Sequence, residues 1–495
     1  MLCIPILGPS FAEAQKQIQT ASKLDCAVEL RLDLFTSVQP REIRKLTESC
    51  VNPLIFTLRP ESQGGFFKGD HNSRLDLIRE IAALSPTSIP IYIDLEYDTP
   101  IDFIKQLKQD HPHVCVILSY HNFQETPENL ESILAMLKEK PAEIYKFSAM
   151  TNSVIDALRL LEFQQNGGNN LAAMGMGPFG YITRVLGKIK GSRLVYASLN
   201  DSLQTASGQI SAEVLLDTYR FRSQTSSTTI YGLIGLPTNK SFGNLFHNAM
   251  YGDVGLGSVY LKMDVKPDEL ADFFPLAKKL DFQGLSVTMP LKENILPWIS
   301  EMDSISKEIG AVNTISIQNG ELLGFNTDGF GAIEAIEEVE ELSGKTILVL
   351  GAGGAAKAIV YTAKQRGAHV IVLNRTVEKA DWLAETMGCT AGRLENAQEY
   401  FLEGVDIVVN CTPESMPIDK NIPLGNALVM DMRNIPVETE FLLNAKKQGC
   451  RVIYGYQMYV YQALKQIEIW FGVKQEKSAP VAKKIIQGIL NQVKR

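Results

Sequence analysis

The stretch TILVLGAGGAAKAIVYTAKQRG, residues 346–367, predicts an apolar strand, a glycine-rich turn and a helix in direct succession. The turn matches the pattern G-x-G-x-x-G/A, which allows a pyrophosphate to approach the backbone N–H groups at the start of the helix. A glycine turn that binds no nucleotide is the alternative, but motif, context and spacing agree on a Rossmann dinucleotide-binding domain, which we place at residues 336–455. The candidate cofactor-binding residues of the turn are Gly351, Gly353, Gly354, Ala355 and Ala356.

The residues after the next predicted strand indicate which dinucleotide binds. That strand, HVIVL, ends at Leu373 and is followed by Asn374, Arg375 and Thr376. An acidic residue here would bond the ribose 2'-hydroxyl of NAD, and none is present. A guanidinium flanked by an amide and a hydroxyl can instead hold a 2'-phosphate through charge-assisted hydrogen bonds. The sequence therefore favours NADP(H) over NAD.

The first part of the chain alternates short apolar runs with helix-like stretches. Eight such runs in about 220 residues predict an α/β fold of the parallel (β/α)8 type, a TIM barrel, whose active site lies at the C-terminal ends of its strands. We place this barrel at residues 1–222. The runs are LCIPIL, AVELRLDLF, PLIFTLR, IPIYIDLEY, VCVILSYH, EIYKFSAM, LAAMGM and RLVYASLN.

Period-2 alternation along these runs directs ionisable side chains into the barrel. For any single pair a structural salt bridge is an equal alternative, but so many ionisable groups near strand ends are costly unless they pair or serve a ligand. The ensemble therefore favours a site. The residues expected to face the lumen are Glu29, Arg31, Asp33, Thr57, Arg59, Asp94, Glu96, Ser119, His121, Lys146 and Ser148.

Lys146 and His121 suggest the chemistry of that site. A lysine among apolar neighbours has its ammonium form disfavoured, which leaves a neutral amine able to attack a ketone and form an imine. An iminium withdraws electrons from the neighbouring C–H, so a nearby imidazole can remove that proton and later protonate a departing hydroxyl. The pair therefore predicts dehydration through a Schiff base.

The motifs ELRLD, TLRPESQGG, SYHNF, YKFSAM, MGMGPFGYITR and TASGQ resemble the type I 3-dehydroquinate dehydratases. The resemblance implies that Lys146 forms the imine, that His121 is the general acid and base, and that Arg184 holds the substrate carboxylate. Gln63 stands where many members carry a glutamate hydrogen-bonded to the catalytic histidine. The other residues that it implies line the site are Glu29, Arg31, Arg59, Thr205, which replaces a common serine, and Gln209.

A new domain begins after the linker-like stretch SQTSSTT, residues 223–229. Residues 230–335 contain polar turns after apolar segments, PTNKS, SVTMPLK, GAVNT and GFNTDG, which we assign to a substrate-binding lobe. Lys292 and Asp328 could relay the proton of a hydroxyl that gives up its hydrogen as hydride. A surface ion pair is the alternative for these two residues.

The same turns resemble the shikimate dehydrogenases from about Tyr231 to the C-terminus. The resemblance implies that Lys292 and Asp328 are the catalytic pair, and that the helices of residues 456–495 pack back on the substrate lobe. Gly243 takes the place of a second serine of the family, and Ser286 that of an asparagine; DMRNIP differs from DMVYNP. Implied substrate-binding residues are Ser241, Thr288, Asn313, Thr327 and Gln462, and further cofactor-binding residues are Asn410, Thr412 and Gly455.

Bulk properties exclude several other classes. A net charge of -8 disfavours nucleic-acid binding, and no apolar run approaches the length that spans a bilayer. Seven cysteines without a Cys/His cluster indicate a reducing compartment, which we take as the cytoplasm, and no metal site. The N-terminus has no basic region typical of a signal peptide. The oligomeric state stays open.

The two resemblances imply consecutive reactions on one carbon skeleton. The first half would convert 3-dehydroquinate to 3-dehydroshikimate, and the second would reduce that product to shikimate with NADPH, so small molecules are the expected partners. A ligand-binding regulator built on the same folds is one alternative. A chain in which only one half is active is the other.

Overall fold

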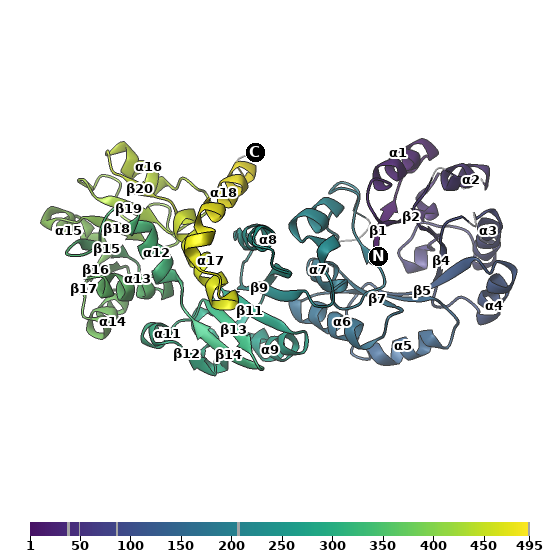
Figure 1. The fold of residues 1–495 in the computed structure, drawn as a ribbon, viewed down its shortest axis with the longest axis horizontal. Helices are drawn as coiled ribbons and strands as arrows, with labels where there is room; N and C mark the ends of the chain where they lie inside the picture. Colours follow the sequence, from purple (N-terminus) through teal and green to yellow (C-terminus); the bar gives the residue numbers. More distant parts are fainter. Residues whose placement is uncertain (37–39, 49, 86–87, 205–207, 494–495) are drawn as a thin grey trace. The chain divides into compact units, whose positions relative to one another are not determined.

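The computed structural model describes residues 1–36, 40–48, 50–85, 88–204 and 208–493 (Figure 1). The chain divides into two compact units. One consists of Met1–Thr228 with Ala271–Leu280, and the other of Thr229–Leu270 with the chain from Asp281 onward. The division at residue 228 falls inside the stretch that the sequence predicts to be a linker.

Eight parallel strands form the sheet of the first unit, in the order β7-β6-β5-β4-β3-β2-β1-β8. Pairing of β1 with β8 and a 3.0 Å hydrogen bond from Arg193 N to Leu171 O bring the ends of this sheet together. The predicted TIM barrel is confirmed. Its strands are β1 (Leu2–Ile6), β2 (Ala27–Arg31), β3 (Leu54–Thr57), β4 (Ile91–Glu96), β5 (Val114–Asn122), β6 (Ile144–Met150), β7 (Leu171–Met176) and β8 (Val195–Tyr196).

The last strand is much shorter than the sequence predicts. The run RLVYASLN, residues 193–200, suggests a full strand, but β8 contains only Val195 and Tyr196. Ser198 instead forms a bridge with Ser211, and its N–H donates to Ile210 O at 3.0 Å. These bonds replace those that a longer strand would make with a neighbouring strand, so the chain leaves the sheet early.

Helices between the strands cover the outside of the barrel (Figure 1). Three of them begin at a side chain that accepts a hydrogen bond from the backbone, namely Ser10, Asp70 and Ser153, which is the usual way to satisfy a free N–H at a helix start. The helices are α1 (Phe11–Ala21), α2 (Pro40–Glu48), α3 (His71–Leu84), α4 (Ile101–Asp110), α5 (Leu130–Lys138), α6 (Val154–Asn166) and α7 (Tyr181–Gly187).

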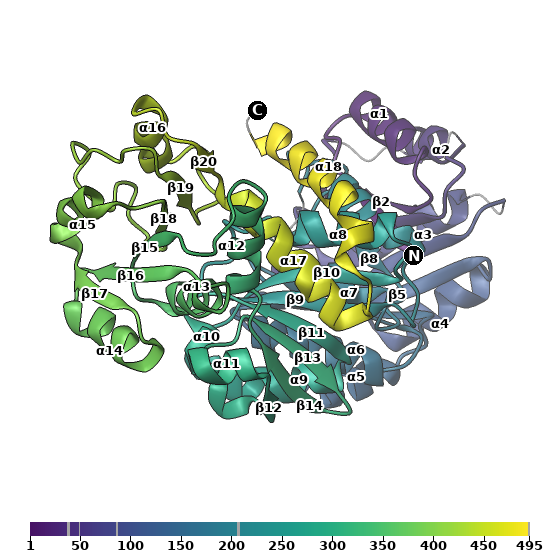
Figure 2. The same ribbon diagram turned by 60° about the vertical axis from the view of Figure 1, so that its left-hand side comes forward.

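The second unit contains a mixed sheet in the order β10-β9-β11-β13-β14-β12. Helices α17 (Gly455–Phe471) and α18 (Gln475–Val493) share a buried core with α8 (Gly243–Asp253) and with two of its strands, and Figure 2 shows both helices in yellow. The strands are β9 (Thr229–Gly235), β10 (Ser258–Asp264), β11 (Phe282–Val287), β12 (Glu301–Met302), β13 (Thr314–Gln318) and β14 (Glu321–Phe325). Further helices are α10 (Leu291–Asn294) and α11 (Ser304–Ile309). Helix α9 (Leu270–Lys279) follows β10 in the chain, but all of its residues except Leu270 belong to the first unit.

A second, fully parallel sheet of this unit has the order β17-β16-β15-β18-β19-β20. Numbered along the chain, this is the order 3-2-1-4-5-6 of a Rossmann fold, as predicted. The strands are β15 (Thr346–Leu350), β16 (His369–Asn374), β17 (Thr390–Arg393), β18 (Ile407–Asn410), β19 (Leu428–Asp431) and β20 (Val452–Ile453). The helices are α12 (Asp328–Glu337), α13 (Gly354–Gln365), α14 (Val377–Met387), α15 (Ala397–Glu403) and α16 (Glu440–Lys447).

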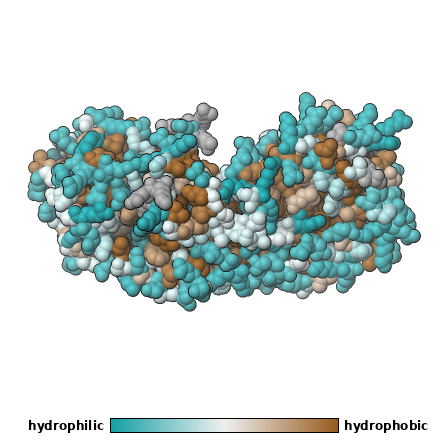
Figure 3. Space-filling view, in the orientation of Figure 1, coloured by the Kyte–Doolittle hydropathy of each residue, from teal (hydrophilic) through white to brown (hydrophobic). Residues whose placement is uncertain are grey.

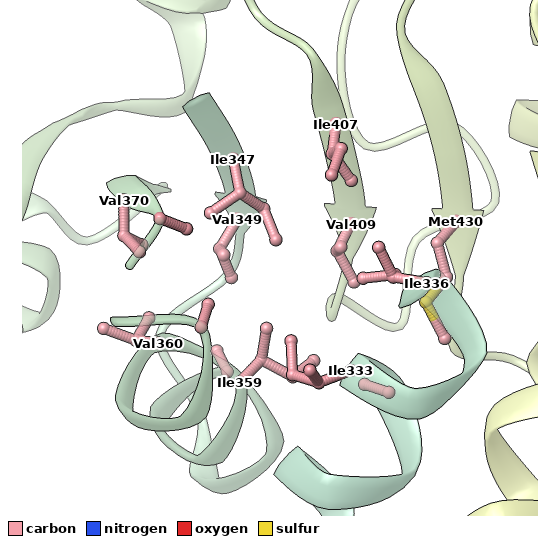
Figure 4. Close-up of a cluster of buried hydrophobic side chains, with 14 of the residues drawn as sticks. Ile333, Ile336, Ile347, Val349, Ile359, Val360, Val370, Ile407, Val409 and Met430 are labelled. Carbon is pink, nitrogen blue, oxygen red and sulfur yellow. The ribbon is translucent and has the colours of Figure 1, made fainter. Parts of the chain in front are cut away.

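Helix α12 connects the substrate lobe to the core of the Rossmann sheet. Its residues Ile333 and Ile336 pack with Ile359 of α13 and with Val349 and Val409 of the sheet (Figure 4). Because Asp328 is the first residue of the same helix, this packing fixes the position of the predicted catalytic carboxylate.

Hydrophobic and hydrophilic residues are interspersed on the face drawn in Figure 3. Among the described residues, no helix has the length and apolar character needed to cross a membrane.

Candidate active sites

A cavity of about 90 Å³ lies in the barrel and is lined by residues from the C-terminal ends of its strands and from the loops that follow. Its position is the one at which TIM barrels carry their active sites. The lining residues are Glu29, Arg31, Arg59, Gln63, Gly64, His121, Phe123, Lys146, Ser148, Met174, Met176, Arg184, Tyr196 and Gln209.

Lys146 is buried on β6, with a relative exposure of 5%. Its Nζ donates to Asp94 Oδ2 at 2.7 Å and lies 3.9 Å from Glu29 Oε1. The same atom lies 4.7 Å from the centre of the Tyr196 ring. The amine that would attack a ketone therefore lies beside two carboxylates and one aromatic face, at the wall of the cavity. The predicted apolar surroundings of Lys146 are wrong in this respect, because strands β2 and β4 direct Glu29 and Asp94 toward the same point.

Asp94 remains a carboxylate in this setting. Burial alone would raise its pKa, but the positive charges of Lys146 and Arg59 hold the pKa below its usual value. Glu29 accepts a hydrogen bond from Thr57 Oγ1 at 2.7 Å. Asp94 can therefore accept the hydrogen bond from Lys146 Nζ at any physiological pH.

His121 lies on β5 beside Arg59, whose Nη1 is 2.8 Å from Nε2 and 3.0 Å from Nδ1 of the ring. Burial lowers the pKa of His121 well below its usual value, and the charges of Arg59 and Lys146 lower it further. The ring is therefore neutral at pH 7, the form that a base needs. Phe123 stacks on it with the ring centres 5.8 Å apart.

The two other arginines of the cavity differ in their partners. Arg31 forms a double hydrogen bond to Asp33, at 2.9 and 2.7 Å, so its charge is compensated. Arg184 donates only to the carbonyls of Gly175 and Gly180, at 2.6 and 2.8 Å, and pairs with no carboxylate among the described residues. Burial lowers the pKa of Arg184 to about 10, which still leaves it charged at pH 7. Arg184 is thus the cation available to an anionic ligand.

Gln209 also reaches the cavity, while Thr205 lies outside the described residues. The loop that carries Gln209 passes very close to the loop after β7. At Gly208, φ is +76°, and an added Cβ would lie 1.7 Å from Gly177 O. Only glycine fits this position, so Gly208 sets the approach of Gln209 to the site.

The barrel site contains residues that the sequence does not single out. Tyr196, Phe123, Met174 and Met176 line the cavity. Phe123 follows the run VCVILSYH and Met176 ends the run LAAMGM, whereas Met174 and Tyr196 lie inside predicted strands and carry no separate signal. Asp94 and Glu96 are predicted to face the lumen, and the structure places both in the hydrogen-bond network around Lys146 and Arg59.

In the second unit, Lys292 of α10 donates a hydrogen bond to Asp328 Oδ2. Asn313 Nδ2 donates to Asp328 Oδ1 at 2.8 Å and to Thr327 Oγ1 at 3.0 Å. Thr327 Oγ1 in turn donates to Gln462 Oε1 at 3.3 Å. The structure therefore brings five of the predicted residues from four separate segments into one network.

Ser241 and Thr288 lie on neighbouring loops of the same lobe, but no hydrogen bond joins them to this network among the described residues. Ser241 Oγ accepts from Gly243 N at 3.0 Å. An added Cβ at Gly243 would lie 3.1 Å from Ser241 Oγ and 3.1 Å from Tyr260 Cε1. The ring of Tyr260 thus occupies part of the space in which the family's second serine would stand.

The glycine turn of the Rossmann sheet lies next to Lys292. A Cβ added at Gly354 would lie 3.9 Å from Lys292 Cδ. A Cβ added at Gly353 would have no atom within 4 Å of it. Gly351 has φ +108° and faces Thr412, whose side chain bonds to Asn410. The N-terminus of α13 therefore presents free backbone N–H groups to an open space beside the catalytic pair.

Of the remaining residues predicted to bind the cofactor, some lie at a second cavity of the Rossmann sheet and others are packed in the protein interior. Arg375 lines a second cavity of about 480 Å³, at the ends of β16 and β17. Asn374 bonds to Thr376 O at 2.8 Å, which shapes the turn that carries Arg375. Ala356 is buried in the hydrophobic core, and a Cβ at Gly455 would lie 2.3 Å from Arg433 O. Ala356 and Gly455 therefore serve close packing around the cofactor loops.

Arg393 lies beside Arg375, at a position that the sequence did not indicate. It pairs in register with Asn374 on the neighbouring strand and lines the same cavity as Arg375. It lies 19 residues beyond Asn374, in a stretch without a motif, so only the strand order brings it there. No group of metal-ligating side chains able to hold an ion occurs in the described part of the chain.

Three family descriptions match the chain in succession. Residues 2–226 match type I 3-dehydroquinase, residues 233–315 match the shikimate dehydrogenase substrate binding domain, and residues 334–433 match shikimate / quinate 5-dehydrogenase. The order of these matches follows the barrel, the mixed sheet and the Rossmann sheet.

Relatives of similar length carry both halves. The chain is 34% identical to a bifunctional 3-dehydroquinate dehydratase/shikimate dehydrogenase, chloroplastic, of Arabidopsis thaliana, over 96% of this chain and 82% of that protein. It is 32% identical to the shikimate biosynthesis protein AroDE of Chlamydia pneumoniae, over 95% of each. A shikimate dehydrogenase (NADP(+)) of Thermococcus kodakarensis is 40% identical over 50% of this chain and 93% of its own length. The chain therefore belongs to the family of bifunctional 3-dehydroquinate dehydratases/shikimate dehydrogenases.

Proposed function

We propose that the barrel dehydrates 3-dehydroquinate through an imine on Lys146 and that the second unit reduces the product, 3-dehydroshikimate, to shikimate. The observation that carries the first half is the burial of Lys146 and His121 in one cavity whose only uncompensated cation among the described residues is Arg184. A substrate with one ketone and one carboxylate suits all three side chains: its ketone meets Lys146, the carbon next to the ketone meets His121, and its carboxylate meets Arg184.

In the barrel, the ammonium of Lys146 gives a proton to solvent, its amine attacks the ketone, and loss of water gives the iminium. His121 then removes a proton from the adjacent carbon, and the electron pair forms an enamine. The enamine expels the hydroxyl group at the next carbon, which His121 protonates so that it leaves as water. Hydrolysis of the iminium returns the ketone and frees Lys146. Arg184 holds the substrate carboxylate throughout.

The second unit fits NADPH at the glycine turn. The free N–H groups of α13 suit the pyrophosphate, and Arg375 with Arg393 provides two guanidinium groups for a 2'-phosphate. The Thermococcus kodakarensis relative is named for NADP(+), which supports the same choice. When bound, NADPH supplies the hydride for the ketone.

Lys292 and Asp328 supply the proton that accompanies this reduction. Lys292 donates it to the new alkoxide oxygen, and Asp328 keeps the ammonium oriented through the hydrogen bond that joins them. Asn313 fixes the other oxygen of Asp328, at 2.8 Å. Asn313, Thr327 and Gln462 then face the hydroxyl groups of the substrate, and Ser241 with Thr288 faces its carboxylate.

The domain boundaries are part of the proposal: a dehydratase barrel at 1–222, a linker at 223–229, a substrate-binding domain at 230–335, a Rossmann domain at 336–455 and C-terminal helices at 456–495. The three separate sheets and the shared core of α17 and α18 with α8 support this division. Helix α12 crosses the boundary at 335, because its start carries Asp328 and its end packs in the Rossmann core.

We place the protein in the cytoplasm, because all seven cysteines are free thiols, as a reducing compartment requires. Cell fractionation tests this placement, and recovery in an organelle or secreted fraction would contradict it.

Separate assays of the two halves test the proposed function. With 3-dehydroquinate alone, we expect the absorbance of a conjugated enone to rise. With 3-dehydroshikimate and NADPH, we expect NADPH to be oxidised in step with shikimate formation. Binding of these compounds without turnover in either assay would support a ligand-binding regulator instead, and turnover in one assay would support a chain with a single active half.

A further inference from the structure

Glu96, at the end of β4, lies between Arg59 and His121. Arg59 Nη1 donates to its two carboxylate oxygens at 3.0 and 3.3 Å, and His121 Nδ1 lies 3.4 Å from Glu96 Oε2. All three side chains are less than a tenth exposed. A carboxylate, a guanidinium and an imidazole are thus in mutual contact at the wall of the dehydratase cavity.

Gln63 lies in the same cavity without a charge. It takes the place of the glutamate that many type I dehydratases carry beside the catalytic histidine. Its Oε1 is buried and has no hydrogen-bond partner among the described residues. The neighbouring Gly64 touches Phe123, which stacks on His121, so this loop does reach the histidine. An amide at this point cannot stabilise an imidazolium by charge.

We infer that Glu96 is the positioning residue of His121 and that it supplies from β4 the negative charge that position 63 lacks. The inference deepens the dehydratase function proposed above and rests on it. Glu96 acts through His121 and Arg59 and does not itself contact the substrate.

Two effects follow from the contacts of Glu96. The carboxylate compensates Arg59, whose guanidinium otherwise disfavours a positive charge on the adjacent ring. Its Oε2 also lies 3.4 Å from His121 Nδ1, so its negative charge favours a proton on the imidazole ring. Both effects help His121 to take a proton from carbon and to hold it until the hydroxyl leaves.

The charge of Glu96 depends on pH near neutrality. Burial raises the pKa of Glu96 to about 7, and the neighbouring Asp94 adds to the rise while Arg59 opposes it. The carboxylate is therefore present above pH 7 and is lost as the pH falls below it. The charged groups that face Glu96 come from the loop after β3, from β4, from β6 and from α3: Arg59, Asp94, Lys146 and Arg74.

The variant Glu96→Gln tests this role. We expect its kcat for dehydration to fall roughly 10- to 100-fold, the value of a charge-assisted hydrogen bond, with KM little changed. We expect kcat of the wild type to fall below pH 7, and this fall should be absent from the variant. Adding Gln63→Glu to Glu96→Gln should restore most of kcat and the pH dependence. Glu61→Gln, an exposed glutamate two residues from Gln63, is the matched control and should change neither.

Borohydride reduction in the presence of 3-dehydroquinate shows whether the site of Glu96→Gln is intact, because it traps the adduct on Lys146. A trapped adduct with wild-type kcat, or a loss of kcat that Gln63→Glu does not repair, overturns the inference. If no adduct forms in Glu96→Gln, the site of that variant is disturbed, and the single variant Gln63→Glu tests the inference in its place. Its kcat should stay within about twofold of wild type, since Glu96 already serves His121, and a rise of about tenfold or more shows that the histidine lacked a carboxylate. An inactive wild type would instead contradict the dehydratase function.

Discussion

At the scale of single residues, two lysines divide the chemistry of the chain. Lys146 is surrounded by Asp94, Glu29 and the ring of Tyr196, an environment whose negative charge and aromatic face can stabilise an iminium. Lys292 pairs with Asp328, an environment that keeps an ammonium ready to donate. One lysine is thus placed to become a nucleophile and the other to remain an acid.

Replacing Lys146 separates the two activities. We expect Lys146→Ala to lower dehydration by roughly ten-thousand-fold or more, because no other amine lines the cavity. Reduction of 3-dehydroshikimate should remain at the wild-type rate, since Lys292 lies in another domain. Lys105→Ala, an exposed lysine of α4, serves as the control and should change neither rate. Loss of both activities in a folded Lys146→Ala protein would contradict independent sites.

Arg393 should contribute to the choice of cofactor. It shares a cavity with Arg375 and is exposed, so we expect Arg393→Ala to raise KM for NADPH about 3- to 10-fold. KM for NADH should not change, because NADH has no 2'-phosphate. Arg366→Ala, which removes an exposed guanidinium paired with Glu334 and Glu337, is the control. Equal effects on NADPH and NADH would assign Arg393 to the stability of the domain.

His247 links the stability of the second unit to pH. It is buried against Tyr260, with ring centres 4.1 Å apart, and burial lowers its pKa to about 4. In the unfolded chain it takes up a proton near pH 6.5, so between these values the unfolded state binds more protons than the folded state. The free energy of unfolding should therefore fall by up to about 1.4 kcal/mol per unit as the pH drops from 6.5 to 4.

Urea unfolding at several pH values measures this effect. All three tryptophans lie in the second unit, at positions 298, 382 and 470, so their fluorescence reports on it alone. His247→Phe keeps the ring and removes the titration, and its unfolding free energy should depend less on pH than that of the wild type. The same slope in both proteins would show that another group is responsible.

At the scale of elements, the sequence predicts most of the strands of each sheet, but it does not predict where every strand ends or which strands lie side by side. Glycine turns, alternation and apolar runs are local signals, and they suffice for the barrel and the Rossmann sheet. The early end of β8 depends on the bridge between Ser198 and Ser211. These two residues are 13 positions apart, so no local sequence pattern indicates that they pair. Arg393 and Tyr196 likewise enter their sites through strand order, so no motif could indicate them.

The loop after β8 gives a prediction at this scale. Gly208→Ala places a Cβ against Gly177 O at a positive φ, so the two loops must separate. We expect a loss of roughly 1–3 kcal/mol in stability from the backbone conformation alone, and a larger total loss. Dehydration should also fall, because Gln209 moves with the loop.

Gly191→Ala is the matched control for this loop. Gly191 also has a positive φ, +82°, but a Cβ there would meet no atom within 4 Å. Its stability loss should stay in the range of the backbone cost, and its dehydration rate should be that of the wild type. Equal behaviour of the two variants would mean that the contact of Gly208 with Gly177 does not position the site.

At the scale of the whole molecule, the two units carry consecutive steps on one carbon skeleton. The motifs identify each half independently, and the product of the first reaction is the substrate of the second. The network around Asp328 shows why motifs sufficed here, because four of its five residues stand in the polar turns SVTMPLK, GAVNT and GFNTDG; these are Lys292, Asn313, Thr327 and Asp328. The position of Ser241 relative to that network could not be predicted, because it depends on how Tyr260 fills the space beside Gly243.

One measurement tests the central claim most directly: incubation of the purified chain with 3-dehydroquinate and NADPH, followed by quantification of 3-dehydroshikimate, shikimate and NADPH. We predict that shikimate accumulates, that one NADPH is consumed for each shikimate formed, and that both stop in Lys146→Ala until 3-dehydroshikimate is added. Formation of 3-dehydroshikimate without NADPH consumption, or no change in any of the three, would contradict the account.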